Sequence, residues 1–137
     1  MTAKEYLSRA YLLDQQIRSK LEQVQSLREL AYQCTANTEN ERVSATPDPT
    51  KTQEIIAKIV DLEDEITDDV ETLVDLKREI KTLIDTIKKP LHRLILEQRY
   101  LMGKEWIDIA DALDYDVRHI TRLHGSALKS IIIPKMS

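Results

Sequence analysis

The first third of the chain repeats apolar residues at intervals of three and four. This spacing places the apolar side chains on one face of a helix, so the sequence predicts a long amphipathic helix over residues 3–34. One polar residue, Lys20, interrupts the series. The apolar members of the series are Ala3, Tyr6, Ala10, Leu13, Ile17, Val24, Leu27, Ala31 and Cys34.

A stricter repeat covers residues 52–88. Apolar residues recur there every seven positions and also fill the partner positions of the heptad, which is the pattern of a coiled-coil-like helix. Asp69 occupies a partner position where an apolar residue is expected. The seven-residue series consists of Ile59, Ile66, Leu73, Ile80 and Ile87.

Residues 35–50 break the period, because they hold Pro47 and Pro49 and few apolar side chains, and they predict an exposed loop. Two amphipathic helices joined by such a loop most simply form an antiparallel hairpin, which assigns residues 1–88 to one helical domain. In that hairpin Lys20 lies about one helical turn from the level of Asp69. Two interpretations stay open: the two residues pair and fix the register, or each side chain extends into solvent. A hairpin alone leaves apolar surface exposed, so we expect a homo-oligomer, with a dimer favoured.

Residues 89–137 carry the signals of three short helices. Pro90 suits the first turn of a helix, and Gly103 suits its left-handed C-terminal cap. A second helix is expected over residues 105–113, and Asp116 is a good N-cap for a third helix. These elements describe a helix-turn-helix. The expected fold class is therefore all-α, with a long antiparallel helical hairpin followed by a helix-turn-helix bundle over residues 89–137.

Composition narrows the classes of protein. Two glycines are too few for a turn-rich β fold or a glycine-rich phosphate loop. No apolar run approaches the roughly 20 residues of a membrane span, the N-terminus lacks the pattern of a signal peptide, and Cys34 is the only cysteine. We therefore expect a cytoplasmic protein that does not bind membranes. The histidines lack metal-ligand spacing and no catalytic dyad is apparent, so we expect no metal, no cofactor and no enzymatic activity.

Charge is distributed unevenly along the chain. The net charge is −4, yet residues 89–137 hold eight Lys or Arg against six Asp or Glu, and no acid follows Asp116. The acidic stretch 61–75 is expected to be a solvated helix face. The alternative is that it forms a docking surface for a basic partner such as RNA polymerase.

The exposed face of the third C-terminal helix is therefore predicted to be basic and to bind double-stranded DNA. Arginine can donate two hydrogen bonds to a guanine edge, and lysine suits phosphate groups. The candidate base-reading residues are Arg118, His119, Thr121 and Arg122. The candidate phosphate contacts are Lys104, Lys129 and Lys135. The alternative is a protein-binding face, which the lack of nearby acids disfavours.

The C-terminal third resembles region 4 of bacterial sigma factors, a helix-turn-helix that binds promoter DNA in that family. The resemblance rests on residues 96–100 and on Gly103, Trp106, Ile109, Ala110, Leu113, Tyr115, Asp116, Ile120, Arg122, Leu123, His124, Ala127 and Leu128. The sequence departs from the pattern at Glu105, where a Ser or Thr cap is usual, and at Asp114, where Gly is common. Gly125 is a further departure, since it falls inside the recognition helix.

Nearly the whole chain, including residues 1–7 and 74–80, resembles small prophage proteins that are grouped with ArpU- and RinA-like phage transcription regulators. The resemblance implies a sequence-specific, DNA-binding transcription regulator of phage or prophage origin. In such a protein the hairpin would serve oligomerisation or contact with RNA polymerase. Two alternatives stay open: a DNA-packaging recognition subunit like a small terminase, and a coiled-coil adaptor between proteins.

Overall fold

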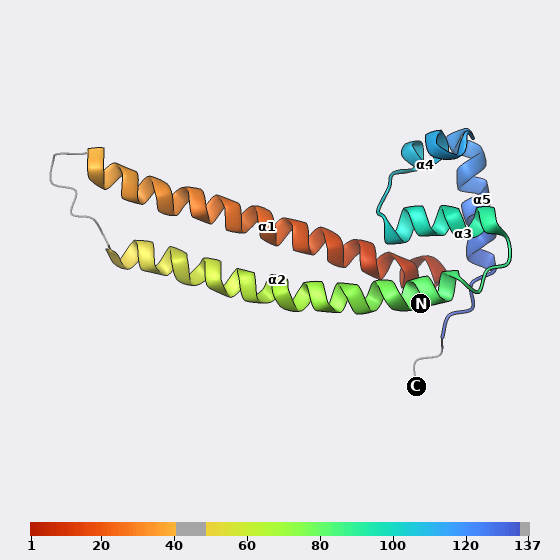
Figure 1. Cartoon of the computed structure of the whole chain (residues 1–137), viewed down its shortest axis with the longest axis horizontal. Coiled ribbons are helices and arrows are strands. Elements are labelled where there is room, and N and C mark those ends of the chain that lie inside the picture. Colours follow the sequence, from red (N-terminus) through yellow and green to blue (C-terminus); the bar gives the residue numbers. More distant parts are fainter. Residues whose placement is uncertain (41–48, 135–137) are drawn as a thin grey trace. The chain divides into compact units, whose positions relative to one another are not determined.

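The computed structural model describes the backbone of residues 1–40 and 49–134 and the side chains of residues 1–35 and 50–134. The described part is helical and holds no strand, which confirms the all-α prediction (Figure 1). No helix in it is both long and apolar enough to cross a membrane. The elements are α1 (Ala3–Asn40), α2 (Pro49–Ile84), α3 (Pro90–Leu96), the π-helical turn η1 (Glu97–Leu101), α4 (Trp106–Leu113) and α5 (Val117–Lys129).

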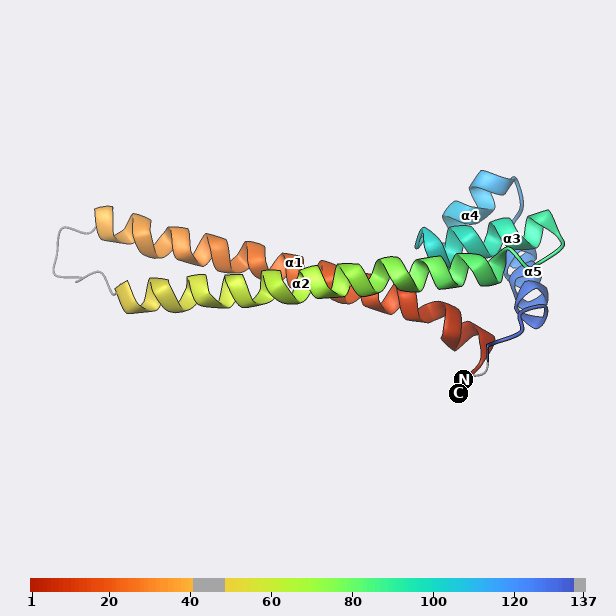
Figure 2. The same cartoon turned by 60° about the horizontal axis from the view of Figure 1, so that its bottom comes forward.

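Contacts divide the chain into two compact units. One consists of Gln15–Glu71, and the other combines Met1–Asp14 with Thr72–Ser137. In both units α1 and α2 run antiparallel and side by side, as the two views in Figures 1 and 2 show. The division differs from the expected boundary at residue 88. The start of α1 and the end of α2 belong to the same unit as the C-terminal helices.

The unit of Gln15–Glu71 confirms the pairing of the two polar residues in its apolar seam. The ammonium Nζ of Lys20 lies 2.6 Å from Oδ2 of Asp69 and 3.5 Å from a carboxylate oxygen of Glu65. The hydrogen bond to Asp69 raises the pKa of Lys20. The apolar seam around this pair consists of Val24, Ile55 and Ile59, with Leu27, Ala31, Cys34, Leu62 and Ile66 packed against them.

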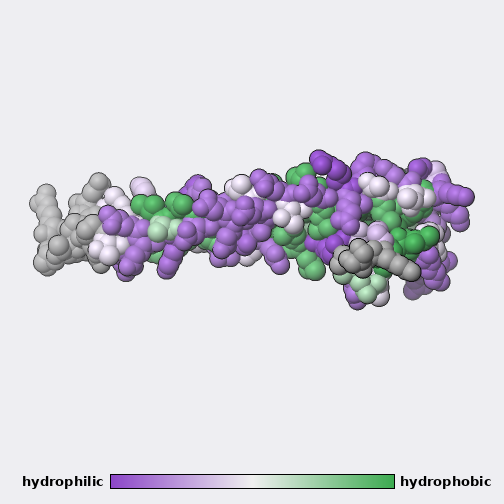
Figure 3. All heavy atoms as spheres, turned by 90° about the horizontal axis from the view of Figure 1, so that it is seen from below, coloured by the Kyte–Doolittle hydropathy of each residue, from purple (hydrophilic) through white to green (hydrophobic). Residues whose placement is uncertain are grey.

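One face of α2 in this unit stays apolar and exposed. Ile56 and Val60 are about half exposed, and they lie one position beyond the buried Ile55 and Ile59. Figure 3 shows apolar residues gathered on α2 between hydrophilic ones. This surface agrees with the expectation that a two-helix hairpin alone leaves apolar area uncovered.

The two long helices begin and end at other residues than the sequence predicts. The predicted loop covers residues 35–50, and the predicted end of the second helix is residue 88. α1 continues to Asn40, because residues 35–40 contain neither Pro nor Gly, and the hydroxyl of Thr35 donates to the carbonyl of Ala31. α2 begins at Pro49 and ends at Ile84. Lys89 is extended, since the ring of the following proline disfavours helical backbone there. Residues 41–48 of the predicted loop lie outside the described residues.

The C-terminal helices pack on a core of their own. Ile95, Ile109, Ala110 and Ile120 are almost completely buried, and Leu91, Trp106, Leu113 and Leu123 pack against them. Pro90 occupies the first turn of α3, as predicted. Gly103 has a φ of +68°, which confirms the predicted left-handed cap. The regular helix expected up to Leu101 instead changes at Glu97 into the wider turn η1.

Candidate nucleic-acid interface

A three-residue turn joins α4 to α5. Asp114 adopts the left-handed conformation with a φ of 64°, and the N–H of Tyr115 donates to the carbonyl of Ala110 across 3.0 Å. The carboxylate of Asp116 accepts a 2.7 Å hydrogen bond from the backbone N–H of His119, which confirms Asp116 as the N-cap. Ala110 is 2 % exposed, because its small side chain lies in the core that α4 and α5 share.

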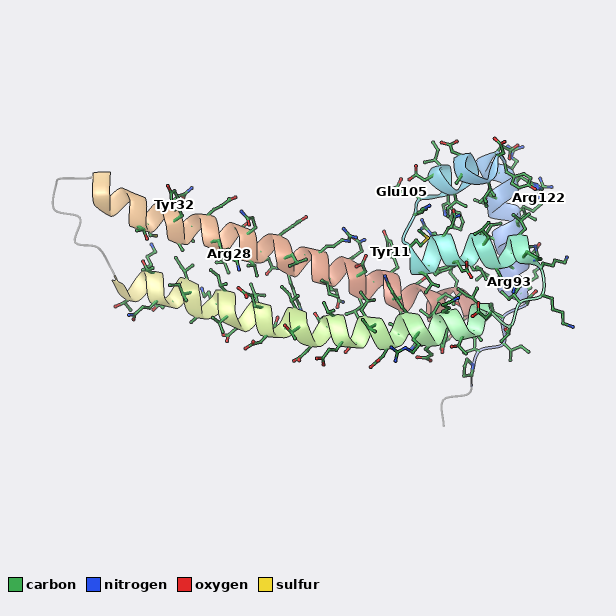
Figure 4. The ribbon with its side chains drawn as sticks, in the orientation of Figure 1. Tyr11, Arg28, Tyr32, Arg93, Glu105 and Arg122 are labelled. Atoms are coloured by element: carbon green, nitrogen blue, oxygen red, sulfur yellow. The ribbon has the colours of Figure 1, made fainter. Side chains whose placement is uncertain are left out.

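The outer face of α5 presents two arginines four residues apart. Arg118 and Arg122 are both exposed, and neither forms an ion pair with any residue in the described part of the chain. Residues four apart lie on the same face of a helix, so their guanidinium groups project from one side of α5. Figure 4 shows Arg122 on the opposite side of this unit from Glu105, which precedes α4.

The other candidate base-reading residues take part in local contacts. The hydroxyl of Thr121 donates to the backbone carbonyl of Arg118 across 2.9 Å. His119 is half-buried, and the centroid of its ring lies 4.9 Å from that of Tyr115. Of the four candidate base-reading residues, Arg118 and Arg122 are therefore the two whose side chains have no such contact within the described residues.

The candidate phosphate contacts lie in different places. Lys129 is exposed in the last turn of α5, seven residues after Arg122 and so on nearly the same face. Lys104 is half-buried between η1 and α4, and its backbone carbonyl accepts a hydrogen bond from Arg99. Lys135 lies outside the described residues.

The inner face of α5 is fixed by a buried polar contact. Nε2 of His124 lies 2.6 Å from the hydroxyl of Tyr100, and the centroid of its ring lies 4.5 Å from that of Trp106 in an edge-on arrangement. Burial, together with the smaller effect of the positive charges of Lys4 and Arg99, lowers the pKa of His124 to about 4. His124 is therefore neutral at pH 7, and it packs and makes one side-chain hydrogen bond.

Sequence reasoning gave no role to Arg99. Its guanidinium carbon lies 4.6 Å from the centroid of the Trp106 ring, and Nη1 donates to the carbonyl of Lys104 across 3.0 Å. The sequence offers a weak signal in retrospect, because an arginine seven residues before the only tryptophan provides a cation and an aromatic ring. Nothing in the spacing indicates that the two side chains meet.

Fold and site together define an all-α protein in which a short helix, a tight turn and a basic-faced helix follow each other in one compact unit. Comparisons of the chain with protein-family models, with curated proteins and with solved structures found no match.

Proposed function

We propose that this protein binds DNA sequence-specifically and places the N-terminal half of α5 in the major groove. One observation carries the proposal: Arg118 and Arg122 are exposed and without ion-pair partners in the described residues, on the outer face of the second helix of a helix-turn-helix. Each guanidinium is available to donate two hydrogen bonds to O6 and N7 of a guanine. Lys129, farther along the same helix, is available to a backbone phosphate.

Charge favours DNA over a protein as the partner of this face. A protein-binding helix commonly mixes acidic, basic and apolar positions, whereas α5 contains no acidic residue. The acidic stretch 61–75 belongs to α2, where it would repel the phosphate backbone, and it is assigned no DNA contact.

The biological role that we propose is transcription regulation in a phage or prophage, after the resemblance to region 4 of sigma factors. The paired helices of Gln15–Glu71 would then serve dimerisation or contact with RNA polymerase, and the exposed Ile56 and Val60 support such a use. A monomer or dimer in solution fits a regulator. A ring of eight or more subunits would instead favour the packaging alternative, and size measurement by light scattering separates the two.

The experiment that tests DNA binding begins with selection of bound oligonucleotides from random duplex DNA. Arg118→Ala and Arg122→Ala should each reduce the preference for the selected sequence over a scrambled one by about 5- to 150-fold, since a bidentate base contact contributes about 1–3 kcal/mol. Arg78→Ala is the matched control, because it removes the same charge from an exposed position of α2. No enrichment from the random pool, or full preference in the double arginine variant, would overturn the assignment of α5.

Lys129→Ala separates affinity from sequence preference. A phosphate contact carries no sequence information, so this variant should weaken binding to the selected and scrambled duplexes by the same factor. It should also reduce the slope of log K against log salt by about one unit. A loss of preference in Lys129→Ala would show that the lysine reads a base instead.

A further inference from the structure

A small cavity lies in the unit formed by Met1–Asp14 and Thr72–Ser137. Its volume is about 70 Å³. This is roughly the liquid volume of two water molecules, so the cavity admits one small group and excludes a drug-sized ligand. The lining residues are Lys4, Ser8 and Tyr11 of α1, Arg99 and Tyr100 of η1, and Trp106 of α4.

The chemistry of this lining is cationic and hydroxylic. Lys4 and Arg99 supply two positive charges, Ser8 and the two tyrosines supply hydroxyl groups, and none of the described lining residues is acidic. The same two cations lower the pKa of the nearby His124, after the larger effect of its burial. The cavity therefore favours a negatively charged occupant over a neutral or cationic one.

Arg99 is oriented to hold such an occupant. A guanidinium carries five N–H donors, and only Nη1 of Arg99 has a hydrogen-bond partner in the described part of the chain, the carbonyl of Lys104. The guanidinium carbon lies over the Trp106 ring and is 5.8 Å from the centroid of the Tyr11 ring. Cation–π contact with these rings leaves the remaining N–H donors of Arg99 for a ligand.

The backbone around Arg99 is also unusual. η1 covers Glu97–Leu101, and π-helical turns are rare and frequently occur at functional sites. Two consecutive residues of η1, Arg99 and Tyr100, line the cavity. Tyr100 in turn bonds to His124 of α5 through its hydroxyl, so the cavity wall is tied to the inner face of that helix.

We propose that this cavity binds a phosphate group, with Arg99 donating to its oxygens and Lys4 neutralising its charge. Arginine is suited to phosphate because its N–H groups match the spacing of two oxygens. The site is separate from the outer face of α5 and does not depend on the proposed base contacts. A free phosphate and a backbone phosphate of DNA have the same chemistry, and the experiment below distinguishes these two sources.

The only tryptophan of the chain, Trp106, lines the cavity and reports on it directly. The full chain is titrated with inorganic phosphate while its tryptophan emission is recorded, with chloride at equal ionic strength as the reference. We expect a saturable change with phosphate and none with chloride. Arg99→Gln should raise the Kd at least about tenfold, the expected effect of losing charged hydrogen bonds.

Two further variants make the result decisive. Lys4→Gln removes the second cation from an exposed position of the first turn of α1, so it should weaken phosphate binding even if Arg99→Gln fails to fold. Arg93→Gln is the matched control, because Arg93 lies on α3 outside the cavity lining and away from Tyr11 (Figure 4). No response of the full chain to phosphate, or an equal loss in Arg93→Gln, would overturn the proposal.

A duplex of the selected sequence then identifies the source of the phosphate. If phosphate and duplex compete for the Trp106 signal, a backbone phosphate fills the cavity. If phosphate binds with unchanged affinity to the duplex-saturated protein, the ligand is a free phosphate. Either result supports the site. The phosphate titration itself contains no DNA, so its failure is distinct from failure of the proposed DNA binding.

Discussion

The two glycines of the chain form a natural pair for testing the backbone of the helix-turn-helix unit. Gly125 lies inside α5, and Gly103 has a φ of +68° between η1 and α4. At both positions an added Cβ atom would meet no heavy atom of another part of the described chain within 4 Å. Substitution by alanine therefore tests backbone conformation at each position without introducing a steric clash.

The expected effects on the free energy of unfolding are opposite in sign. Gly125→Ala should raise it by about 1 kcal/mol, because alanine is favoured over glycine by that amount in a helix interior. Gly103→Ala should lower it by about 1 kcal/mol: the left-handed conformation costs an alanine about 1–2 kcal/mol, and a smaller unfolded-state entropy returns part of this. The two variants should thus differ by about 2 kcal/mol.

Urea unfolding followed by far-ultraviolet circular dichroism measures this difference. The urea dependence of the unfolding free energy should be the same in both variants and in the parent chain, so that the shift in midpoint reports stability alone. A loss of stability in Gly125→Ala equal to that in Gly103→Ala would refute the reasoning, since it would mean that α5 is not a continuous helix at Gly125.

Three other predictions concern the two compact units. The folded pKa of His124 is about 4, below its ordinary 6.5, so the unfolded chain binds the proton first as the pH falls. The free energy of unfolding should therefore drop by about 3 kcal/mol between pH 6.5 and 4. Urea titrations across that range should show that His124→Gln lacks this component. Asp69→Ala should lower the Tm, because it leaves the half-buried Lys20 without its nearest carboxylate. Joint replacement of Lys20 and Asp69 by leucine should restore or raise the Tm. A Tm unchanged by Asp69→Ala would argue against the pair. A fragment of residues 89–137 should show no cooperative thermal transition by circular dichroism, and a sharp transition would mean that residues 1–14 are dispensable for folding.

Much of the fold follows from the sequence because its signals are local. A heptad repeat specifies which face of a helix is buried, so α1 and α2 and their antiparallel pairing could be predicted. The sequence left open whether Lys20 and Asp69 pair or extend into solvent, and the structure shows the pair. The residues that begin the C-terminal helices act on the backbone next to them: Pro90 begins α3, and the side chain of Asp116 caps α5. The exposure of Arg118 and Arg122 follows from the same amphipathic pattern.

Other features of the structure could not be predicted from the sequence, because they depend on competition between weak local preferences or on contacts between distant segments. Residues 35–40 favour neither helix nor loop strongly, and α1 extends through them because nothing in them breaks a helix. The π-helical turn at Glu97–Leu101 has no residue signature, since it arises where hydrogen-bonding registers compete. The cavity beside Arg99 required three elements to meet, and no spacing along the chain encodes that meeting.

The division of the chain explains how a small helix-turn-helix becomes stable. A segment of about fifty residues with three short helices buries too little surface to be stable on its own. Here the unit also buries Leu7 of α1 and Ile80 and Ile84 of α2 completely, and the hydroxyl of Tyr6 bonds to the carboxylate of Glu79. The unit that contains the helix proposed to read DNA therefore also contains buried residues from the first turns of the chain. A substitution at Leu7 should consequently weaken DNA binding through the stability of the whole unit, although Leu7 itself has no place on the DNA-facing side.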